Sequence, residues 1–311
     1  MFLKNTRDLL WLIIGCLQSY LLLGKVKPDA IFTPGGFVGV PVGLAASHRH
    51  IPFITHDLDA IPGLANRINS RWAVAHAVAL PVETYTYPKD KTFYVGVPVS
   101  DKYQPVDQKL QIKYRNGLGL QDDARVLCIT GGGLGAERLN RAIAKIVPVL
   151  LQKYPSLTIF HIAGRKNEAS LAQHYDELLA QELRSRVVVK GFVDDLYRYS
   201  GSADIVVARA GATNMAEFAL QRRACVVVPN PVLTGGHQLK NAEQFEKNGA
   251  IVVVKESEMD QKLLPSICEL FDSSAKRQAL SQAIGRFAKP DATNKLAQLI
   301  ISIATSKGAN K

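Results

Sequence analysis

Residues 204–217, DIVVARAGATNMAE, contain the groups best suited to bind an anionic ligand. Residues 205–208 are apolar and mostly β-branched, which predicts a buried strand. Small residues follow, and Thr213 and Asn214 are of the types that cap helices, so we expect a helix from Met215. A helix start leaves N–H groups unpaired and carries a partial positive charge, which suits an anionic oxygen. Taken alone, the stretch fits a phosphate-binding turn and an unliganded α/β turn equally well.

Glu217 lies about one turn into that helix, where its carboxylate can face the ligand and accept two ribose hydroxyls. A second glycine-rich turn, GGGLGA at residues 131–136, follows an expected strand at 125–130 and begins a helix at about 136–153. Glycines let the backbone approach a ligand closely. The turn lacks the GxGxxG dinucleotide pattern, and residues 163–165, Ala-Gly-Arg, supply no acidic residue after the next strand. We therefore expect no nicotinamide cofactor.

The elements that must position these turns alternate regularly between strand and helix. Short apolar runs predict ten strands, at residues 30–33, 51–56, 75–80, 92–95, 125–130, 157–162, 187–189, 205–208, 225–228 and 251–254. Helical patterns separate them, and the tail from about 265 to 306 is also helical. This alternation predicts an α/β protein with parallel sheets covered by helices on both faces. The polar, basic stretch 101–123, with one short helix, reads as the crossing between two halves.

The chain of 311 residues has a formal net charge of +11, which favours anionic partners. Its Lys and Arg residues are scattered, without a basic-aromatic run, so we expect a lipid surface or a phosphorylated substrate and no nucleic acid. Four cysteines, Cys16, Cys128, Cys225 and Cys268, lie far apart without metal-ligand spacing. We expect thiols in a reducing cytoplasm and no metal site.

Residues 9–23, LLWLIIGCLQSYLLL, are strongly apolar but short for a membrane span, and they contain Gln18 and Ser19. Lys4 and Arg7 precede the run, but no small-residue cleavage site follows it, which argues against a signal peptide. Two interpretations remain open. The segment is either a buried core helix or a helix at a membrane surface, where Trp11 and the flanking lysines would suit the interface.

Taken together, the motifs resemble those of the MurG family, the lipid I N-acetylglucosaminyltransferases of bacterial cell-wall synthesis in glycosyltransferase family 28. Six motifs within residues 27–254 occur in the family's order. They are GGFVGVPVGLAA (35–46), HDLDAIPGLANR (56–67), GGGLGA (131–136), GFVDD (191–195), RAGATNMAE (209–217) and HQLKNA (237–242). The second of these is the most specific.

The resemblance implies a GT-B fold of two Rossmann-like parallel-sheet domains. It assigns residues 1–100 to an acceptor and membrane-side domain, 101–123 to a linker, 124–290 to the UDP-sugar donor domain and 291–311 to a C-terminal helix and tail. The family's first strand and GGTGGH loop have no match here, so we expect the first domain to be truncated. Its sheet would then have an exposed edge.

The same resemblance implies a donor site, residue by residue. Glu217 would hold the ribose hydroxyls, the backbone of Val193 would contact the uracil, and Gly211, Ala212 and Thr213 would lie at the diphosphate. The donor cleft would be lined by Gly132, Gly133 and Gly135. Gln238 and Asn241 would touch the GlcNAc ring, although both also fit a role as helix caps. Two helix starts aimed at one diphosphate can stabilise the leaving UDP without a metal.

The implied reaction is inverting transfer of GlcNAc from UDP-GlcNAc to lipid I, giving lipid II at the cytoplasmic face of the cell membrane. An inverting displacement needs a base beside the acceptor oxygen. Asp57 is our candidate as base or acceptor-orienting group, and His56 is the second. The family has Glu and Asn where this chain has Asp57 and Asp59, and Arg where it has Ser100, which puts the acceptor chemistry in doubt.

Two alternatives follow from these departures. The first is a related UDP-sugar transferase with another lipid-linked acceptor, whose missing N-terminal part comes from a partner chain. The second is a non-catalytic homologue that binds nucleotide sugars. If calorimetry shows that the chain does not bind UDP-GlcNAc, both transferase interpretations fail. If the chain binds UDP-GlcNAc but transfers no sugar to lipid I, the non-catalytic homologue is favoured.

Overall fold

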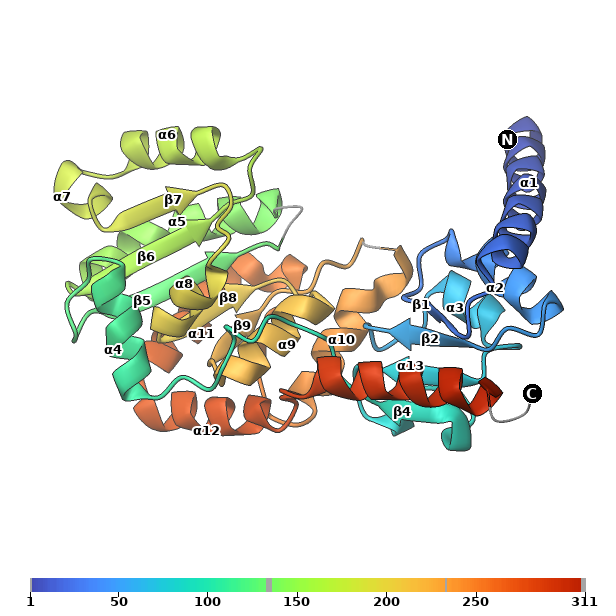
Figure 1. Cartoon of the computed structure of the whole chain (residues 1–311). Helices are drawn as coiled ribbons and strands as arrows, with labels where there is room; N and C mark the ends of the chain where they lie inside the picture. Colours follow the sequence, from blue (N-terminus) through green and yellow to red (C-terminus); the bar gives the residue numbers. More distant parts are fainter. Residues whose placement is uncertain (1, 133–135, 233, 309–311) are drawn as a thin grey trace. The chain divides into compact units, whose positions relative to one another are not determined.

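The computed structural model of the protein describes residues 2–132, 136–232 and 234–308 (Figure 1). The chain divides into two compact units, one of Met1–Pro98 with Asp291–Lys311 and one of Val99–Pro290. Residues 101–123 therefore belong to the second unit, and the C-terminal helix belongs to the first. Each unit is built on a parallel sheet, and in the described residues the ten expected strands are all present.

The first unit has a four-stranded parallel sheet in the order β1-β2-β3-β4. The strands are β1 (Ile31–Thr33), β2 (Phe53–Asp57), β3 (Ala75–Val78) and β4 (Thr92–Tyr94), and the helices are α1 (Phe2–Val26), α2 (Gly39–His48), α3 (Leu64–Asn69) and α13 (Ala292–Gly308). In register, Ile31 lies beside Phe53 and Ile54 beside Ala75. Among the described strands β1 pairs with β2 alone, so its other side is an open edge of the sheet.

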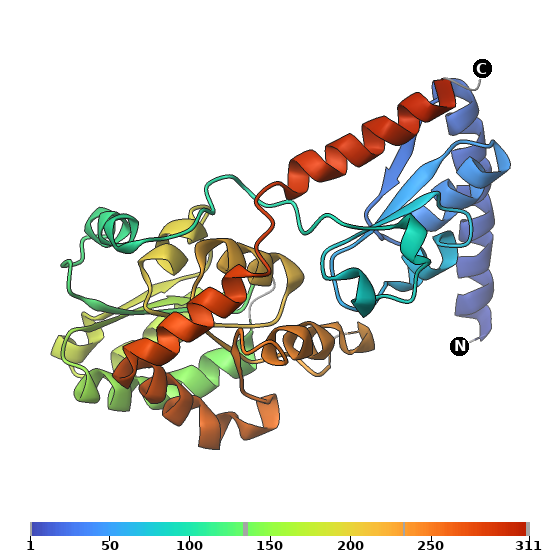
Figure 2. The same ribbon diagram turned by 90° about the horizontal axis from the view of Figure 1, so that it is seen from below.

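Side chains that alternate along β2 pack to opposite faces of this sheet. Phe53 packs with Leu23 of α1 and with Ala45 and Ala46 of α2. Ile54 packs with alanines of β3 and with Leu296 of α13. Helices therefore cover both faces, and α13 returns from the far end of the chain to cover the second one (Figure 2).

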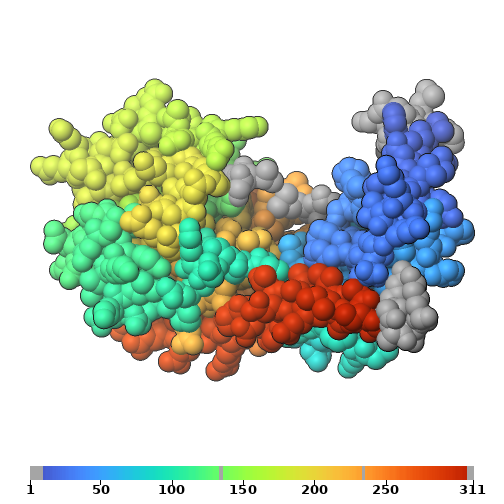
Figure 3. Space-filling model, in the orientation of Figure 1, coloured from blue at the N-terminus to red at the C-terminus, as the bar shows by residue number. Residues whose placement is uncertain are grey.

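The apolar helix α1 is mostly uncovered. Leu23 is buried, but Trp11, Leu17 and Leu21 keep 64%, 60% and 62% of their surface exposed. Figure 3 shows side chains of α1, in dark blue, on the surface of the molecule. The expectation of a buried core helix is therefore wrong for the described side chains, because only one face of α1, which includes Gly15, Tyr20 and Leu23, lies against α2. In the part of the chain that the structure describes, no helix has the length and apolar character needed to span a membrane.

The second unit has a six-stranded parallel sheet in the order β10-β9-β8-β5-β6-β7. The strands are β5 (Arg125–Thr130), β6 (Leu157–Ile162), β7 (Val187–Lys190), β8 (Ile205–Ala208), β9 (Cys225–Val227) and β10 (Val252–Val253). The helices are α4 (Gln108–Gly117), α5 (Glu137–Lys153), α6 (Glu168–Leu178), α7 (Gln181–Arg184), α8 (Leu196–Ser202), α9 (Ala212–Gln221), α10 (His237–Glu246), α11 (Met259–Asp272) and α12 (Ser274–Gly285). The chain builds β5, β6 and β7 outward and then returns to place β8 on the other side of β5.

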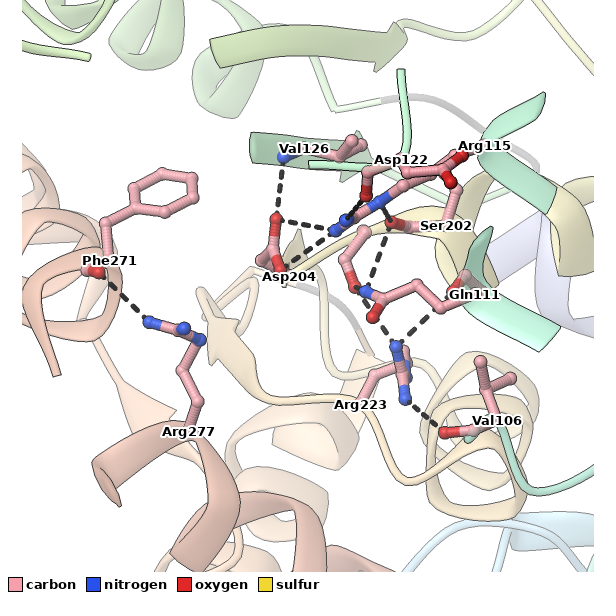
Figure 4. Close-up of polar contacts among 12 residues, drawn as sticks. Val106, Gln111, Arg115, Asp122, Val126, Ser202, Asp204, Arg223, Phe271 and Arg277 are labelled. Atoms are coloured by element: carbon pink, nitrogen blue, oxygen red, sulfur yellow. Dashed lines mark hydrogen bonds and ion pairs between the residues drawn. The ribbon is translucent and has the colours of Figure 1, made fainter. Parts of the chain in front are cut away.

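Buried arginines tie the ends of several elements of the second unit together (Figure 4). Nη2 of Arg115 in α4 donates to both carboxylate oxygens of Asp204 at 3.0 Å, and Nε of Arg115 donates to the carbonyl of Ser202. Arg223 donates to the carbonyl of Val106, which fixes the segment before α4. The arginines thereby give hydrogen-bond donors to backbone carbonyl groups that would otherwise lack a partner at the ends of these elements.

Helix α9 begins at Ala212, three residues before the expected start at Met215. Gly211 is the N-cap residue, with extended backbone angles of φ −70° and ψ 134°. Thr213 and Asn214 lie inside the first turn, so the expectation that they cap the helix is wrong. Glycine is accepted at the N-cap position although it has no side chain to accept hydrogen bonds from the first helix amides.

Candidate functional site

The two glycine-containing turns follow neighbouring strands. Gly132 follows β5 and Gly211 follows β8, and the strands pair with Thr130 beside Ala208. A Cβ atom added at Gly132 would lie 3.7 Å from Nδ2 of Asn214 in α9. After β7 the chain returns to the other side of β5 to form β8, so the strand order reverses between β5 and β8. Parallel sheets bind ligands at such a switch point, outside the carboxyl ends of the strands. Both turns therefore lie close together at the same edge of the sheet.

The start of α9 presents unpaired amides at this position. Its N-cap, Gly211, has no side chain, and no atom lies within 4 Å of a Cβ built there. Since the first amides of a helix have no partner within the helix, Ala212 and Thr213 can offer theirs to an anion. Gly211, Ala212 and Thr213, the predicted diphosphate residues, thus form the start of α9 at the carboxyl end of β8.

The start of α5 lies at the neighbouring turn. Its N-cap, Ala136, makes no side-chain cap bond, and Gly132 has a left-handed φ of +78° that favours glycine. The amide of Gly132 donates to Oγ1 of Thr130 over 3.3 Å, which holds the beginning of the turn. Gly133 and Gly135, the other two predicted residues of this turn, lie outside the described residues.

Val193 lies in the loop between β7 and α8, at the edge of the same sheet. From β8 to β7 is three strand spacings, or about 14 Å at the usual ~4.8 Å per strand. The loop is braced on both sides, because the guanidinium of Arg165 lies 4.3 Å from the ring centroid of Phe192 and Asp195 pairs with Arg198 at 3.0 Å.

Glu217 lies on α9, one turn beyond the helix start, and is half-buried. Its Oε2 atom is buried and has no hydrogen-bond partner in the described part of the chain. Burial raises the pKa of Glu217 to about 7, and the nearby hydroxyl of Tyr103 opposes this rise. A buried acceptor without a partner is the kind of group that a ligand hydroxyl would satisfy.

Gln238 and Asn241, on α10, are both engaged with the backbone of neighbouring loops. Oε1 of Gln238 accepts from the amide of Asn230 at 2.9 Å. Nδ2 of Asn241 donates to the carbonyl of Ala210 at 3.0 Å. These bonds place the beginning of α10 beside the turn that precedes α9, so the two side chains hold the wall of the site in the unliganded structure.

A buried ion pair adjoins the turn between β8 and α9, and the sequence did not single it out. Arg209, next to β8, pairs with Glu256 at 2.6 Å, and the two side chains are only 5% and 8% exposed. Arg138 of α5 pairs with the same carboxylate at 2.7 Å. Although burial raises the pKa of Glu256, the bonds from Arg138 and Arg209 outweigh it, so the pKa is lowered. Nothing in the local sequence around Glu256 indicates these partners.

Asp57 lies at the carboxyl end of β2 in the first unit and is almost completely buried. Its Oδ1 accepts from Nδ2 of Asn66 at 2.9 Å and from the amide of Gly63 at 3.3 Å, and its Oδ2 accepts from the hydroxyl of Tyr87 at 2.8 Å. Burial raises the pKa of Asp57, and these three bonds oppose the rise. The carboxylate therefore anchors the loop that follows β2. The sequence HDLDAIPG alone does not reveal this role.

His56, the second candidate base, is also buried. Its Nε2 bonds the carbonyl of Gly96 at 3.0 Å, and burial lowers its pKa. Both catalytic candidates thus lie in the first unit and inside the protein. In the described ranges, no three His, Cys, Asp or Glu side chains gather as they would around a metal ion.

Comparison with known proteins identifies the family. The model of the glycosyltransferase family 28 C-terminal domain matches residues 126–296, and that of the family's N-terminal domain matches residues 1–78. Three curated relatives bear the name UDP-N-acetylglucosamine--N-acetylmuramyl-(pentapeptide) pyrophosphoryl-undecaprenol N-acetylglucosamine transferase. The one from Bacillus pumilus is 29% identical over 97% of this chain and 81% of its own length, the one from Salinibacter ruber 30% over 93% and 76%, and one from Clostridium perfringens 33% over 84% and 70%.

Solved structures agree with this assignment and confirm the expected GT-B architecture. MurG of Acinetobacter baumannii superposes with a TM-score of 0.74 at 25% identity, over 94% of this chain and 80% of its own. A UDP-GlcNAc 2-epimerase from Neisseria meningitidis, with a TM-score of 0.65 at 14% identity over 94% and 81%, shares the fold. The chain belongs to glycosyltransferase family 28 and is of its MurG type.

Proposed function

We propose that this chain transfers N-acetylglucosamine from UDP-GlcNAc to an undecaprenyl-pyrophosphoryl-N-acetylmuramyl-pentapeptide, the reaction for which its curated relatives are named. The observation that carries the proposal is the pair of glycine-containing turns after β5 and β8, adjacent at the switch point of the second sheet. A Cβ atom built at Gly132 would lie 3.7 Å from Nδ2 of Asn214, and this closeness supports one pyrophosphate bound by both helix starts.

In this proposal the donor lies along the carboxyl edge of the second sheet. Glu217 accepts the ribose hydroxyls, the backbone of Val193 contacts the uracil, and the start of α9 holds the diphosphate. Gln238 and Asn241 contact the GlcNAc ring. Gly132, Gly133 and Gly135 line the cleft. As the glycosidic bond breaks, negative charge develops on the UDP, and amides fixed at two helix starts stabilise it without reorganising.

The acceptor side of the proposal concerns Asp57 and His56. Asp57 already uses three of its roughly four acceptor positions for Asn66, Gly63 and Tyr87, which favours the acceptor-orienting role over that of a base. The loop that it anchors follows β2 at the carboxyl end, where parallel sheets place their ligands. His56 remains the second candidate base, held by the carbonyl of Gly96.

We also propose that α1 brings the enzyme to the cytoplasmic face of an anionic membrane. The helix exposes apolar residues on most of its surface, and Lys25 and Lys27 lie at its C-terminal end. Such a helix lies in the interface, with its apolar side chains among the acyl chains and its cations at the headgroups.

One specific observation favours a second candidate, a transferase completed by another polypeptide. The edge of β1 is open, and the family relatives are longer than the matched region, which spans 81% of the Bacillus pumilus protein. An additional strand paired with β1 would satisfy its free backbone groups. In this alternative, the first sheet binds its acceptor only after that strand has joined it.

A transfer assay with radiolabelled UDP-GlcNAc and several lipid-linked acceptors tests the proposal, with Glu217→Ala as the matched variant. Loss of a charged hydrogen bond to ribose should weaken donor binding by about 1.5–3 kcal/mol. Transfer to lipid I by the chain alone supports the main proposal. Transfer only after a second polypeptide is added favours the completed enzyme. Donor binding without transfer to any acceptor points to a non-catalytic homologue, and no donor binding refutes all three.

A further inference from the structure

One carboxylate joins two arginines that lie far apart in the sequence. Glu256 belongs to the short 3-10 helix η4 (Glu256–Glu258), which lies between β10 and α11. Its Oε1 accepts a hydrogen bond from Nη1 of Arg138 at 2.7 Å, and its Oε2 lies 2.6 Å from Nη1 of Arg209. Each oxygen of the carboxylate is therefore committed to a different guanidinium.

The two arginines stand at the two glycine-containing turns. Arg138 is the second residue of α5, whose N-cap is Ala136. Arg209 follows β8 directly and precedes Gly211, the N-cap of α9, by two residues. Glu256 thus connects the start of α5 with the start of α9, the two helix starts assigned above to the diphosphate.

The two sides of this connection differ in burial. The side chains of Arg209 and Glu256 are 5% and 8% exposed, and Arg209 also donates to the carbonyl of Val228, after β9, at 3.1 Å. The side chain of Arg138 is 72% exposed. Because the pair of Arg209 and Glu256 is fixed in the interior, the bond from Arg138 ties the first turn of α5 to the end of β8.

We propose that Glu256 is a positioning residue for the donor diphosphate, which holds the starts of α5 and α9 at the spacing that lets both offer amides to one pyrophosphate. The inference rests on the donor site proposed above and adds to it a residue from outside the family motifs. Glu256 acts through Arg138 and Arg209 and contacts no atom of the donor.

The charge of Glu256 makes this role distinguishable from simple electrostatic attraction. A diphosphate is an anion, so a carboxylate near it repels it. If Glu256 acted on the donor by its charge alone, its neutralisation would strengthen UDP binding. A positioning role predicts the opposite sign, because the two helix starts would lose their fixed spacing.

The test compares, by calorimetry, the binding of UDP with that of uridine, which lacks the diphosphate. We expect Glu256→Gln to weaken UDP binding about tenfold, which is the loss of one hydrogen bond to a charged group, and to leave uridine binding unchanged. Arg138→Gln should also weaken UDP binding, but it should have little further effect in the Glu256→Gln background, because both substitutions break the same connection.

Lys145→Gln is the matched control for Arg138→Gln. It removes a cation from the same helix, about two turns further along, and breaks an exposed pair with Asp260 whose side chains are 67% and 75% exposed. The affinity of Lys145→Gln for UDP should equal that of the wild type. If Glu256→Gln does not fold, Glu256→Asp replaces it, since it keeps the counter-charge of Arg209 but is one methylene too short to reach both guanidiniums.

The outcomes separate this inference from the donor assignment. Unchanged or tighter UDP binding by the Glu256 variant would overturn the positioning role, and so would equal losses for UDP and uridine. A full effect of Arg138→Gln in the Glu256 variant would also overturn it, because Arg138 would then act on the donor by itself. A wild-type chain that binds neither UDP nor uridine would instead refute the donor site, and the positioning role with it.

Discussion

Gly132 lies against Asn214: a methyl group on the glycine would come within 3.7 Å of the amide nitrogen of the asparagine. The two residues are 82 positions apart in the sequence and follow the adjacent strands β5 and β8. Because the strands are parallel and in register, their carboxyl ends bring both turns to one edge. A single diphosphate can therefore accept from amides on both sides of the switch point.

The two glycines of these turns should respond differently to an added methyl group. Gly132 has φ +78°, a conformation that disfavours any side chain, whereas Gly211 has φ −70° and open space where its Cβ would lie. Gly132→Ala should lower the free energy of unfolding by about 1–2 kcal/mol. Gly211→Ala should leave stability nearly unchanged and should weaken UDP binding, because its methyl group would occupy the diphosphate position.

Thermal unfolding and UDP calorimetry on the same two variants check this pair. Gly211→Ala serves as the stability control for Gly132→Ala. Unchanged UDP affinity in Gly211→Ala would mean that the diphosphate lies elsewhere.

Glu217 should make the unliganded protein less stable at alkaline pH. Burial raises its pKa from 4.5 to about 7, so the folded state holds the proton more tightly than the unfolded state does. The contribution to stability is then complete below about pH 4.5 and is lost as the pH rises through 7. Glu217→Gln, which cannot ionise, should melt at a higher temperature than wild type at about pH 8, and the difference should vanish near pH 5. Equal melting temperatures at both pH values would contradict the raised pKa.

The sequence predicted the sheet strands well, because buried parallel strands appear as short apolar runs between turn residues. Residues 205–208 and 125–130 are examples in which the predicted and observed strands coincide. The start of α9 was placed wrongly because Thr213 and Asn214 are good cap residues, yet glycine occupies the cap. Local preference cannot tell which of two adjacent acceptable positions the packing selects.

The partners of the site residues were beyond local sequence reasoning. Glu256 pairs with Arg209 and Arg138 across separations that no motif spans. The apolar run at 9–23 was ambiguous for a related reason, since apolar character alone does not say what covers a helix. In the structure α2 covers one face of this helix, which includes Gly15, Tyr20 and Leu23, and leaves other apolar side chains exposed.

Removal of the Tyr87 hydroxyl should destabilise the loop after β2. Tyr87 donates to Oδ2 of Asp57, a buried carboxylate, at 2.8 Å. Tyr87→Phe should lower the free energy of unfolding by about 1–3 kcal/mol, because the acceptor is left partly unsatisfied. A double-mutant cycle in urea provides the control: in an Asp57→Asn background the same substitution should have a smaller effect. Equal effects in both backgrounds would show that the hydroxyl acts through another contact.

Neutralising Glu256 should have a large effect, since it would leave the buried guanidinium of Arg209 without its counter-charge. Breaking a buried pair in this way typically costs about 3–5 kcal/mol. Asp260 provides the matched control because its pair with Lys145 is exposed, at 75% and 67%. Asp260→Asn should change stability by less than about 1 kcal/mol. Denaturant unfolding of Glu256→Gln and Asp260→Asn measures the change in the free energy of unfolding for each variant. Similar small changes in both variants would mean that the guanidinium of Arg209 is hydrated.

Helix α1 should bind anionic membranes through its exposed leucines. Leu17 on α1 and Ile301 on α13 have nearly equal exposure, 60% and 59%, so Leu17→Ser and Ile301→Ser form a matched pair. Burial of one leucine side chain in the acyl region contributes about 1.5–3 kcal/mol, so Leu17→Ser should reduce binding on the order of tenfold or more. Ile301→Ser should bind like wild type. Sedimentation with vesicles of phosphatidylglycerol and phosphatidylcholine measures the partition. If the two serine variants bind the vesicles equally, something other than lipid covers the exposed surface of α1. Because β1 leaves an open edge in the first sheet, an added polypeptide is then the next partner to test.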